Sequence, residues 1–428
     1  MVTGTNAEWL KRAEVIAGAT LAGFRLPAEV EFVVDRAVGS HIWDVDGKEY
    51  TDFVLGSGPM ILGHAHPAVV TAVQEALPLG STYYALNRFA IELAEEITDA
   101  VACAECIKFM STGAEATMYA MRLARASTGR SKILKFEGGY HGSHDAAMMS
   151  VAPAAAGSGS EPVPDSAGIP EGVRGDILIA PYNDDELTEV VARTHQDDLA
   201  AIIVEPQQRT IPPKPDFLRA LRQIADDVGA LLIFDEVVTG FRLAYGGAQA
   251  FYGVKPDLAT YGKIIGGGFP MSAIAGRADI LDLSDTRRKG DPSYVHISGT
   301  LSGNPIAAVA GLATLAQLRE PGVYERLAGV GERLRSGLAA AATKHKVPVQ
   351  VIGEGPLVAT HFTDQPIVSY RDVLTGDRNL MTRVNTGLVR RGMLVQLASK
   401  FYLSLAHTDE DIDNCVRAFD EALSEACS

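Results

Sequence analysis

Short apolar runs alternate with amphipathic stretches through the middle of the chain. The nearly continuous apolar character of strands buried on both faces is found in KILKF (132–136), AAIIVEP (200–206) and ALLIFDE (230–236). Apolar residues recur at helical spacing in EATMYAMRLARAS (115–127) and PDFLRALRQIADDVG (215–229). This alternation predicts an α/β fold, in which helices cover both faces of a mostly parallel sheet.

The pattern changes after about residue 310, where helical periodicity dominates. Amphipathic helices are predicted at 322–345 and 409–426, with shorter strands between them. Near the N-terminus, SHIWDVDGKEYTDF (40–53) predicts a hairpin with an Asp-Gly turn, and we expect this region to pack with the C-terminal part. The predicted parts are an N-terminal segment (1–58), a large domain (59–309) and a smaller α+β domain (310–428).

One segment, residues 152–176, fits neither pattern. It is rich in glycine, proline, alanine and serine, and it is too long for a simple connection between elements. We expect it to form a mobile surface loop near a binding site.

Composition and charge narrow the class of protein. The chain has 428 residues, of which 47% are hydrophobic and 21% charged, as in globular proteins with two domains. The net charge of −15 argues against nucleic acid or an anionic membrane surface as the main partner, although a local basic pocket for a small anion is compatible with it. No apolar run reaches the ~20 residues of a membrane span. The N-terminus lacks a signal-peptide pattern, so a cytoplasmic location is expected.

Two of the four cysteines, Cys103 and Cys106, form a C-x-x-C motif. A zinc site needs a second such pair, or histidines at ligand spacing, and neither follows. We therefore expect no metal and interpret both cysteines as small, partly buried residues.

A strand end and a lysine carry the candidate chemistry. The run 230–236 places Asp235 and Glu236 at the end of a buried strand, and open α/β sheets bind ligands at that edge. A structural ion pair is the alternative. In YGKIIGGGFP (261–270), apolar neighbours favour a neutral Lys263 that attacks a carbonyl, and the glycines that follow would let a flat ligand approach. A lysine that caps a helix or binds phosphate is the alternative.

Two other stretches are suited to an anion. Small residues run into a helix N-terminus in STGAEATMYAMRLAR (111–125), where free amides could bind phosphate, and a capping box is the alternative. HISGTLSGNP (296–305) offers hydroxyl groups, among them that of Thr300. A weaker signal is FEGGYHG (136–142), in which Tyr140 at a strand end could stack on a planar ring.

Together these features specify a flat ligand with a carbonyl for Lys263, a basic ring nitrogen for Asp235 and a phosphate. The phosphate would contact Gly113, Ala114 and Thr300. Pyridoxal 5′-phosphate (PLP) meets all of these demands. We therefore expect Lys263 to form a Schiff base with PLP, and Asp235 to keep the ring nitrogen protonated.

Several stretches occur in the same order in a known family. They are IWDVDG, LGHAHP, STGAEATMYAMRLAR, KFEGGYHG, FDEVVTGFR, GKIIGGGFP, SGTLSGNP and SLAHTDEDID. From about Trp43 to its end, the chain resembles the class III (subgroup II) PLP-dependent aminotransferases of fold type I, and within them the branch of the glutamate-1-semialdehyde 2,1-aminomutases. The resemblance implies a large domain with a mostly parallel seven-stranded sheet, and a smaller α+β domain built from the N- and C-terminal segments. It also implies a homodimer with sites at the subunit interface.

The resemblance assigns roles to individual positions. Lys263 would form the Schiff base and move protons, and Asp235 would pair with the pyridine nitrogen. Thr300 would reach the phosphate of the cofactor in the neighbouring subunit. The other cofactor-binding positions that it implies are Ser111, Gly113, Ala114, Tyr140, His141, Glu205, Gln208 and Val237.

The segments expected around the substrate depart from the aminomutase pattern. Arg25 has the spacing of an arginine that lies near the substrate carboxylate, but its surroundings differ. Bulky Tyr83 and Tyr84 replace a run of small residues, and Arg209 stands where the family usually has a small residue. The stretch around Phe401 is shorter and lacks an acidic residue. We expect these five residues to contact the substrate. The alternative is a solvated surface position for either arginine and a core position for the three aromatic residues.

We therefore predict an aminotransferase that passes the amino group of an amino acid or amine to a keto acid through Lys263. An aminomutase of the glutamate-1-semialdehyde type is the alternative, and a racemase or epimerase on the same scaffold is a further one. The presence of both Lys263 and Asp235 argues against a catalytically silent cofactor-binding protein. The sequence does not identify the amino donor.

Overall fold

A computed structural model describes residues 4–21, 23, 25–153, 161–397 and 400–427. Contacts divide the chain into two units. Unit 1 comprises Met1–Pro67, Gly322–Pro366 and Thr375–Ser428. Unit 2 comprises Ala68–Pro321 and Ile367–Leu374.

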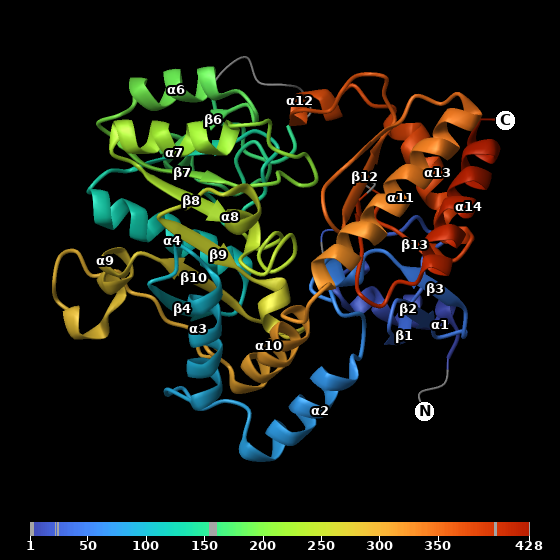
Figure 1. The fold of residues 1–428 in the computed structure, drawn as a ribbon, viewed down its shortest axis with the longest axis horizontal. Helices are drawn as coiled ribbons and strands as arrows, with labels where there is room; N and C mark the ends of the chain where they lie inside the picture. The colour runs from blue at the N-terminus through green and yellow to red at the C-terminus, as the bar shows by residue number, and fades with distance from the viewer. Residues whose placement is uncertain (1–3, 22, 24, 154–160, 398–399, 428) are drawn as a thin grey trace. The chain divides into compact units, whose positions relative to one another are not determined.

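Unit 2 is built around a sheet of seven described strands in the order β4-β10-β9-β8-β7-β5-β6 (Figure 1). Strand β10 pairs antiparallel with β4 and β9, and the remaining pairs are parallel. The strands are β4 (Cys106–Met110), β5 (Lys132–Phe136), β6 (Ile177–Ala180), β7 (Leu199–Val204), β8 (Leu231–Asp235), β9 (Leu258–Tyr261) and β10 (Ser272–Gly276). The predicted mostly parallel, seven-stranded sheet is confirmed.

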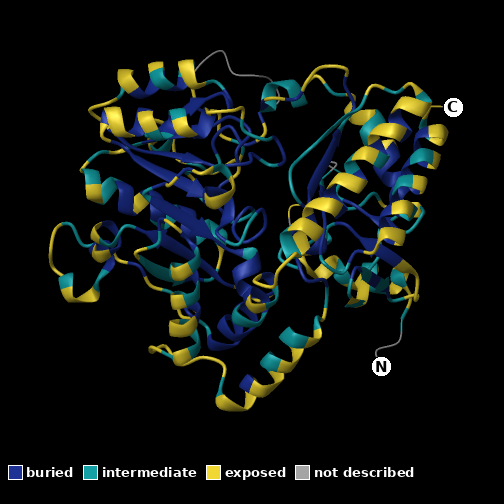
Figure 2. Ribbon diagram, viewed as in Figure 1, coloured by how far each residue is buried: buried dark blue, intermediate teal, exposed yellow. Residues whose placement is uncertain are grey.

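Helices lie on both faces of this sheet because successive residues of a buried strand point to opposite sides. Ile133, Ile203 and Ile233 share one core cluster with residues of helix α4. On the other face, Phe136 meets Phe217 of helix α7 edge-on, with ring centroids 5.6 Å apart. Figure 2 shows the strands buried and the outer sides of the helices exposed. The helices are α2 (Pro67–Ala76), α3 (Arg88–Ala100), α4 (Gly113–Thr128), α5 (Glu171–Arg174), α6 (Asp185–Thr194), α7 (Phe217–Val228), α8 (Gly247–Tyr252), α9 (Ala278–Leu281), α10 (Pro305–Leu318) and α12 (Tyr370–Val373).

The ends of the predicted helices follow local sequence signals. Helix α4 begins after Thr112, which forms a capping box with Glu115, and ends at Gly129 with a φ of 69°. Helix α7 likewise ends at Gly229, with a φ of 66°. Glycine adopts this left-handed conformation at the least cost, so it terminates both helices.

Unit 1 joins the N- and C-terminal segments in two smaller sheets. One has the order β1-β2-β3-β13, in which β13 pairs in parallel with β3, and the other has the order β11-β12-β14. The predicted hairpin is present, with Gly47 in its turn at a φ of 87°. The strands are β1 (Val34–Val38), β2 (His41–Asp44), β3 (Glu49–Asp52), β11 (Gln350–Ile352), β12 (Leu357–His361), β13 (Met393–Leu394) and β14 (Lys400–Tyr402). The helices are α1 (Asn6–Arg12), α11 (Val323–His345), α13 (Arg378–Arg390) and α14 (Asp409–Ala426).

The unit boundaries differ from the predicted ones at 58 and 310. Unit 1 extends to Pro67 because His64 and Gly39 exchange backbone hydrogen bonds of 2.9 and 2.7 Å. It resumes only at Gly322, since helix α10 packs on the segment after β9 in unit 2. Residues Ile367–Leu374, which include helix α12, belong to unit 2.

The predicted loop at 152–176 lies partly outside the described residues, which omit 154–160. Its described part contains the short helix α5. Asp165 connects this segment to the residues that precede it, since its carboxylate accepts hydrogen bonds from the amides of Val151 and Ala152 at 2.6 and 3.0 Å.

Candidate cofactor site

The carboxyl ends of neighbouring parallel strands bring the predicted cofactor residues to one edge of the sheet in unit 2. Lys263 follows β9, and Asp235 ends β8. Glu205 follows β7, and Tyr140 lies beyond the end of β5. Since β10 is antiparallel to both β9 and β4, strand β4 ends at the same edge, where helix α4 begins at Gly113. Open α/β sheets bind ligands at this edge.

Asp235 is buried, and its two carboxylate oxygens have different partners. Oδ1 accepts hydrogen bonds from the amide of Val237 and from the hydroxyl of Thr260, each at 3.1 Å. Oδ2 lies 2.8 Å from Nδ1 of His141, which is also buried. Because an ionised carboxylate only accepts, Nδ1 of His141 carries the proton in this pair. These contacts fix the orientation of the Asp235 carboxylate at the sheet edge.

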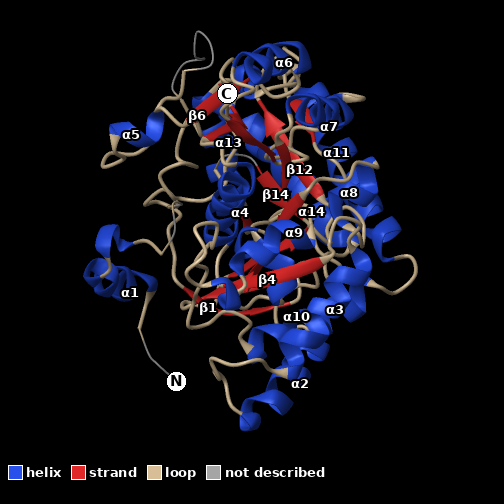
Figure 3. Cartoon of the chain, turned by 90° about the vertical axis from the view of Figure 1, so that its left-hand side faces the viewer, coloured by secondary structure: helices blue, strands red, loops and turns tan. Residues whose placement is uncertain are grey.

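The start of helix α4 presents free amides. Strand β4 leads into this helix (Figure 3), and the carboxylate of Glu115 accepts from the amides of Ser111 and Thr112 at 3.1 and 2.9 Å. Among the described residues, the amides of Gly113 and Ala114 have no acceptor. The capping box and the anion site, considered as alternatives from the sequence, are therefore compatible, because the cap leaves two amides for an anion.

Small residues bring four segments of the site into contact. A Cβ atom on Gly113 would lie 3.0 Å from Val237, and one on Gly262 would lie 3.3 Å from the same side chain. A Cβ atom on Gly142 would lie 2.6 Å from Ala114. Val237 thus lies between the start of α4 and the residue before the lysine, and the loop after β5 contacts the helix start from the other side.

Lys263 begins a short 3₁₀ helix (Lys263–Gly266) with a φ of 49°. A non-glycine residue in this left-handed conformation costs about 1–3 kcal/mol, which the surrounding structure must offset. Such strain is typical of residues held in place for a function.

One of the glycines after the lysine packs closely against a helix. A Cβ atom on Gly267 would lie 2.4 Å from the carbonyl oxygen of Ala310 in helix α10. Gly267 therefore has a packing role, and the expectation that the glycines at 266–268 let a flat ligand approach stays a prediction. Ile264 and Ile265 are buried as predicted, but Phe269 is 39% exposed and is no apolar wall around the amine.

Side chains that follow β7 anchor the loop that follows β5. Buried Glu205 accepts a hydrogen bond from the amide of Tyr140 at 2.9 Å, and Gln208 donates to a carbonyl of the same loop at 2.8 Å. Arg209 donates from Nε to the carbonyl of Gly138 at 3.1 Å, and its guanidinium carbon lies 5.1 Å from the Tyr140 ring centroid. Of the two alternatives for Arg209, the structure supports a position at the site over a solvated one.

These residues fit PLP. Nε2 of His141 and Oε1 of Gln208 are buried and have no hydrogen-bond partner among the described residues. Buried atoms without a partner also occur elsewhere in the described chain, for example Nε2 of His361 and of His407, so they support a ligand site only together with the charged groups and free amides beside them. The free amides of α4 suit a phosphate, the amine of Lys263 an aldehyde and the carboxylate of Asp235 a ring nitrogen. Tyr140, with 42% of its surface exposed, is accessible for stacking on a ring.

The loop that carries Tyr83 and Tyr84 lies beside the segment that carries Thr300. The hydroxyl oxygens of Tyr84 and Ser298 are 3.4 Å apart, and Asn304 donates to a carbonyl of the tyrosine loop at 2.7 Å. The two tyrosines are 42% and 75% exposed, and Thr300 is exposed as well. The structure therefore joins Thr300 and the two tyrosines in one exposed region of unit 2.

The other two predicted substrate residues belong to unit 1. The guanidinium of Arg25 is exposed and forms two hydrogen bonds with Glu31, of 2.8 and 3.2 Å. Phe401 is completely buried in a core cluster of this unit, edge-on to Phe53 with ring centroids 5.8 Å apart. Phe401 is therefore a core residue, and its side chain has no surface for a substrate.

The roles of the two neighbouring carboxylates at the end of β8 are distinct, which the sequence analysis missed. Glu236 is buried and accepts from the amides of Ala248 and Gln249 at 2.5 and 3.3 Å, and from the hydroxyl of Thr239 at 3.1 Å. Burial raises the pKa of Glu236. This residue secures the start of helix α8, whereas Asp235 faces the site. The signal was available, because adjacent residues at the end of a strand point to opposite faces.

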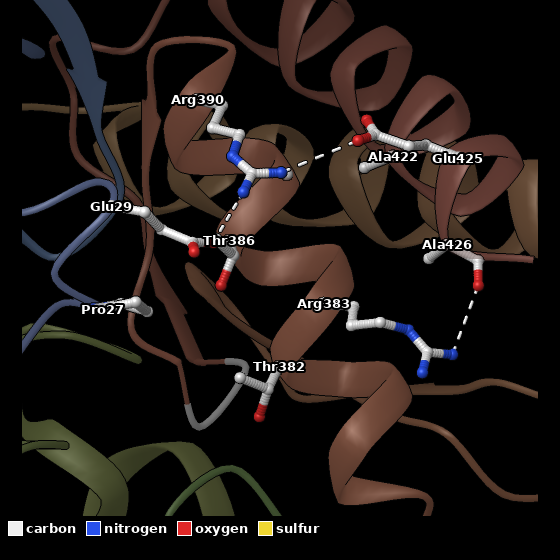
Figure 4. A pocket seen from close by; sticks show the side chains of 10 residues that line it. Pro27, Glu29, Thr382, Arg383, Thr386, Arg390, Ala422, Glu425 and Ala426 are labelled. Carbon is white, nitrogen blue, oxygen red and sulfur yellow. Dashed lines mark hydrogen bonds and ion pairs between the residues drawn. The ribbon is translucent and has the colours of Figure 1, made fainter.

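A separate hollow in unit 1 has a volume of about 400 Å³ (Figure 4). Its charged groups are already engaged: Arg390 forms an ion pair of 2.6 Å with Glu29, and Arg383 donates to the carbonyl of Ala426 at 3.2 Å. The hollow therefore lacks the unpaired buried groups of the site in unit 2. Its lining residues are Pro27, Glu29, Thr382, Arg383, Thr386, Gly387, Arg390, Ala422, Glu425 and Ala426.

No group of three or more metal-ligating side chains was found in the described part of the chain. Cys103 and Cys106 are unpaired, and burial raises the pKa of Cys103 to about 12. Among the described helices, none is both long and apolar enough to cross a membrane.

Three comparisons relate this site to known proteins. The sequence model of the family "Aminotransferase class-III" matches residues 26–423. Glutamate-1-semialdehyde 2,1-aminomutase 2 of Brevibacillus brevis is 42% identical over 399 residues, which are 92% of this chain and 91% of that protein. An omega-transaminase from Sphaerobacter thermophilus is 35% identical, with a TM-score of 0.93 over 99% of this chain and 98% of the other. A beta-phenylalanine aminotransferase from Variovorax paradoxus is 33% identical, with a TM-score of 0.87 over 98% and 94%. The predicted fold type I and the predicted cofactor, PLP, are confirmed.

Proposed function

Because the chain belongs to the class-III aminotransferase family, we propose that it takes the amino group from an amino acid or amine and passes it to a keto acid. PLP, when bound, supplies an electron sink for the negative charge that develops on the substrate carbon. The observation that carries the proposal is the convergence of Lys263, Asp235 and the free amides of α4 at one sheet edge.

Each residue at this edge has a task that its geometry supports. The amine of Lys263 would hold the cofactor, and as a free amine it would take and return the proton on the reacting carbon of the substrate. Asp235 would pair with the protonated ring nitrogen, and the Nδ1–H of His141 orients its carboxylate. The amides of Gly113 and Ala114 bind the phosphate.

A substrate carboxylate would meet Arg209. Nε of Arg209 donates to the carbonyl of Gly138. No hydrogen bond of its two terminal nitrogens to a described residue is seen, so both could bind a carboxylate together. Its position beside Tyr140 supports this role. Arg25 is the second candidate, and it would have to exchange Glu31 for the substrate.

We further propose that the active form is a homodimer. Unit 2 exposes large apolar side chains near Thr300: Leu86 is 92% exposed, Leu79 56% and Leu301 46%. An exposed apolar group of this kind supports a protein interface. Thr300, Tyr83 and Tyr84 would then contribute to the partner's site instead of their own.

An aminomutase is the second candidate, and the curated relatives support it better than they support the aminotransferase. The Brevibacillus brevis protein named for that activity is 42% identical, against 35% and 33% for the two transaminases of known structure. In that reaction the nitrogen returns to a neighbouring carbon of the same molecule, so no keto acid is consumed. Transfer to an acceptor is favoured by the changed substrate segments, which contain Tyr83, Tyr84 and Arg209, and by the names of the two solved structures.

One assay separates the candidates. Protein with PLP is incubated with a panel of amino acids and amines plus 2-oxoglutarate or pyruvate, and in parallel with glutamate-1-semialdehyde alone. We expect turnover that requires the keto acid, and isomerisation without one would establish the second candidate instead. Lys263→Ala should lower either activity by at least about a hundredfold while retaining the fold. Unchanged turnover in Lys263→Ala would overturn the assignment of the lysine.

A further inference from the structure

Lys135 is a buried lysine beside the cofactor site to which the proposed reaction gives no role. It lies in β5 and is 0% exposed. Its Nζ donates to the carbonyl of Gly139 at 3.1 Å and to the carbonyl of Met149, and neither acceptor carries a charge. Lysine is almost never fully buried unless it is paired, so this position needs a physical reason.

The reason lies in a single peptide group, which two oppositely charged residues hold at its two ends. The carbonyl of Gly139 accepts from Lys135. The N–H of Tyr140, in the same peptide group, donates to the carboxylate of Glu205 at 2.9 Å. Hydrogen bonds to charged groups are about twice as strong as neutral ones. The two side chains thereby fix the rotation of this peptide plane.

We propose that Lys135 is a positioning residue for the cofactor site, which fixes Tyr140 and His141 by holding the peptide that precedes them. The inference rests on the proposed function, because it gives the lysine a role only where PLP binds beside this loop. The chain passes directly from Tyr140 to His141, whose Nδ1 lies 2.8 Å from Asp235. A rotated peptide would disturb both the stacking ring and the contact that orients the carboxylate.

The charges around Lys135 make its hold depend on pH. Burial is the largest influence and lowers the pKa of Lys135 to about 7, while Glu205 and Asp165 raise it and Arg209 lowers it. His144 lies nearby, and burial lowers its pKa to about 4, so it is neutral in this range. The lysine is charged at pH values well below 7, and its hydrogen bond to the carbonyl weakens as it loses the charge when the pH rises through 7.

Lys135→Met tests the inference, because it keeps an unbranched side chain but removes the donor. Lys132→Met is the matched control: Lys132 lies at the other end of β5 and also donates to a carbonyl, that of Gly175, at 2.9 Å. The readouts are the dissociation constant of PLP and the visible circular dichroism of bound PLP, at about pH 6 and about pH 9. We expect Lys135→Met to bind PLP about tenfold more weakly at the lower pH, with a reduced signal. The difference should shrink at the higher pH, and Lys132→Met should match the unchanged chain.

Far-ultraviolet circular dichroism and thermal unfolding without PLP establish that each variant folds. Lys135→Gln, which retains a donor, replaces Lys135→Met if the latter does not fold, and it should recover part of the visible signal. A folded Lys135→Met with unchanged affinity and signal at both pH values overturns the inference, as does failure of both variants to fold. Absence of any PLP signal in the unchanged chain overturns the proposed function as well, which distinguishes the two failures.

Discussion

The pair formed by His141 and Asp235 in unit 2 has the same length, 2.8 Å, as the pair formed by His64 and Asp52 in unit 1. Both carboxylates are buried, and both histidines belong to stretches that carry the resemblance to the family, LGHAHP and KFEGGYHG. Length and burial therefore do not separate a candidate functional pair from a structural one.

The remaining polar atoms separate them. In both units the second carboxylate oxygen stabilises a turn of its own chain, since that of Asp52 accepts from the amides of Val54 and Leu55 at 2.7 and 3.0 Å, and that of Asp235 accepts from the amide of Val237 at 3.1 Å. The difference therefore lies with the histidine. In unit 2, Nε2 of His141 is buried without a partner among the described residues. Next to it, Gly142 lies against Ala114, whose amide is free in the described structure. A buried histidine–carboxylate pair indicates a ligand site where neighbouring hydrogen-bonding atoms have no partner in the described chain.

The sharpest test of this comparison changes one carboxylate in each unit. Asp235→Asn should lower kcat/KM by about a hundredfold or more, because a preorganised charge at the reacting centre is lost. It should also lower the free energy of unfolding by about 1–3 kcal/mol, because Asp235 accepts buried hydrogen bonds of the same kind as Asp52. Asp52→Asn should leave the activity of the folded protein within about twofold and lower the free energy of unfolding by about 1–3 kcal/mol. Steady-state kinetics and urea unfolding measure the two effects. Equal losses of activity would show that both pairs serve the reaction.

A second test compares the neighbouring carboxylates at the end of β8. Glu236→Gln places an amide donor among groups that already donate, so we expect the free energy of unfolding to fall by about 1–3 kcal/mol. The visible spectrum of bound PLP should be unchanged in the folded protein, whereas Asp235→Asn should alter it. Loss of the PLP spectrum in a Glu236→Gln protein of normal stability would contradict the division of roles.

The smallest expected effect is a loss of stability at acid pH, to which buried histidines of both units contribute. Burial lowers the pKa of His361 and His407 in unit 1, and of His144 in unit 2, to about 4. The unfolded chain binds a proton at each of them at higher pH than the folded chain, so stability falls as the pH drops from about 6.5 to about 4. His361→Leu should reduce the loss between about pH 6.5 and about pH 5 by on the order of 1–2 kcal/mol. Urea unfolding at the two pH values measures this, and parallel losses in the parent and the variant would contradict it.

Much of the fold was predictable because local periodicity reports how a segment is buried. The predicted strand at 132–136 has the bounds of β5, and the predicted helix at 409–426 has those of α14. The placement of Asp235 at the end of a buried strand was predicted as well, whereas the position of Lys263 after the adjacent parallel strand was seen only in the structure.

Neighbours across the fold were not predictable in the same way. Phe401, expected near the substrate, is a core residue, and Gly267, expected to admit the ligand, contacts helix α10. In both cases the residue type was correctly interpreted as suited to close contact, but its partner lies far away in the sequence. Periodicity indicates which face of an element is buried and leaves open what packs against that face.

The amino-acid order alone was sufficient to predict the strand and helix pattern and the cofactor, and to propose Lys263 as the residue that binds it, because these depend on residue types at short spacings. Long-range packing decided that Asp235, and not Glu236, lies at the candidate site, and that Nε2 of His141 has no partner among the described residues. It also decided that Lys135 and Glu205 hold the two ends of one peptide group. The physical reason is that the tertiary contacts between distant segments determine which buried donors and acceptors find a partner in the protein. Whether a polar residue serves the chain or a ligand is therefore settled in three dimensions.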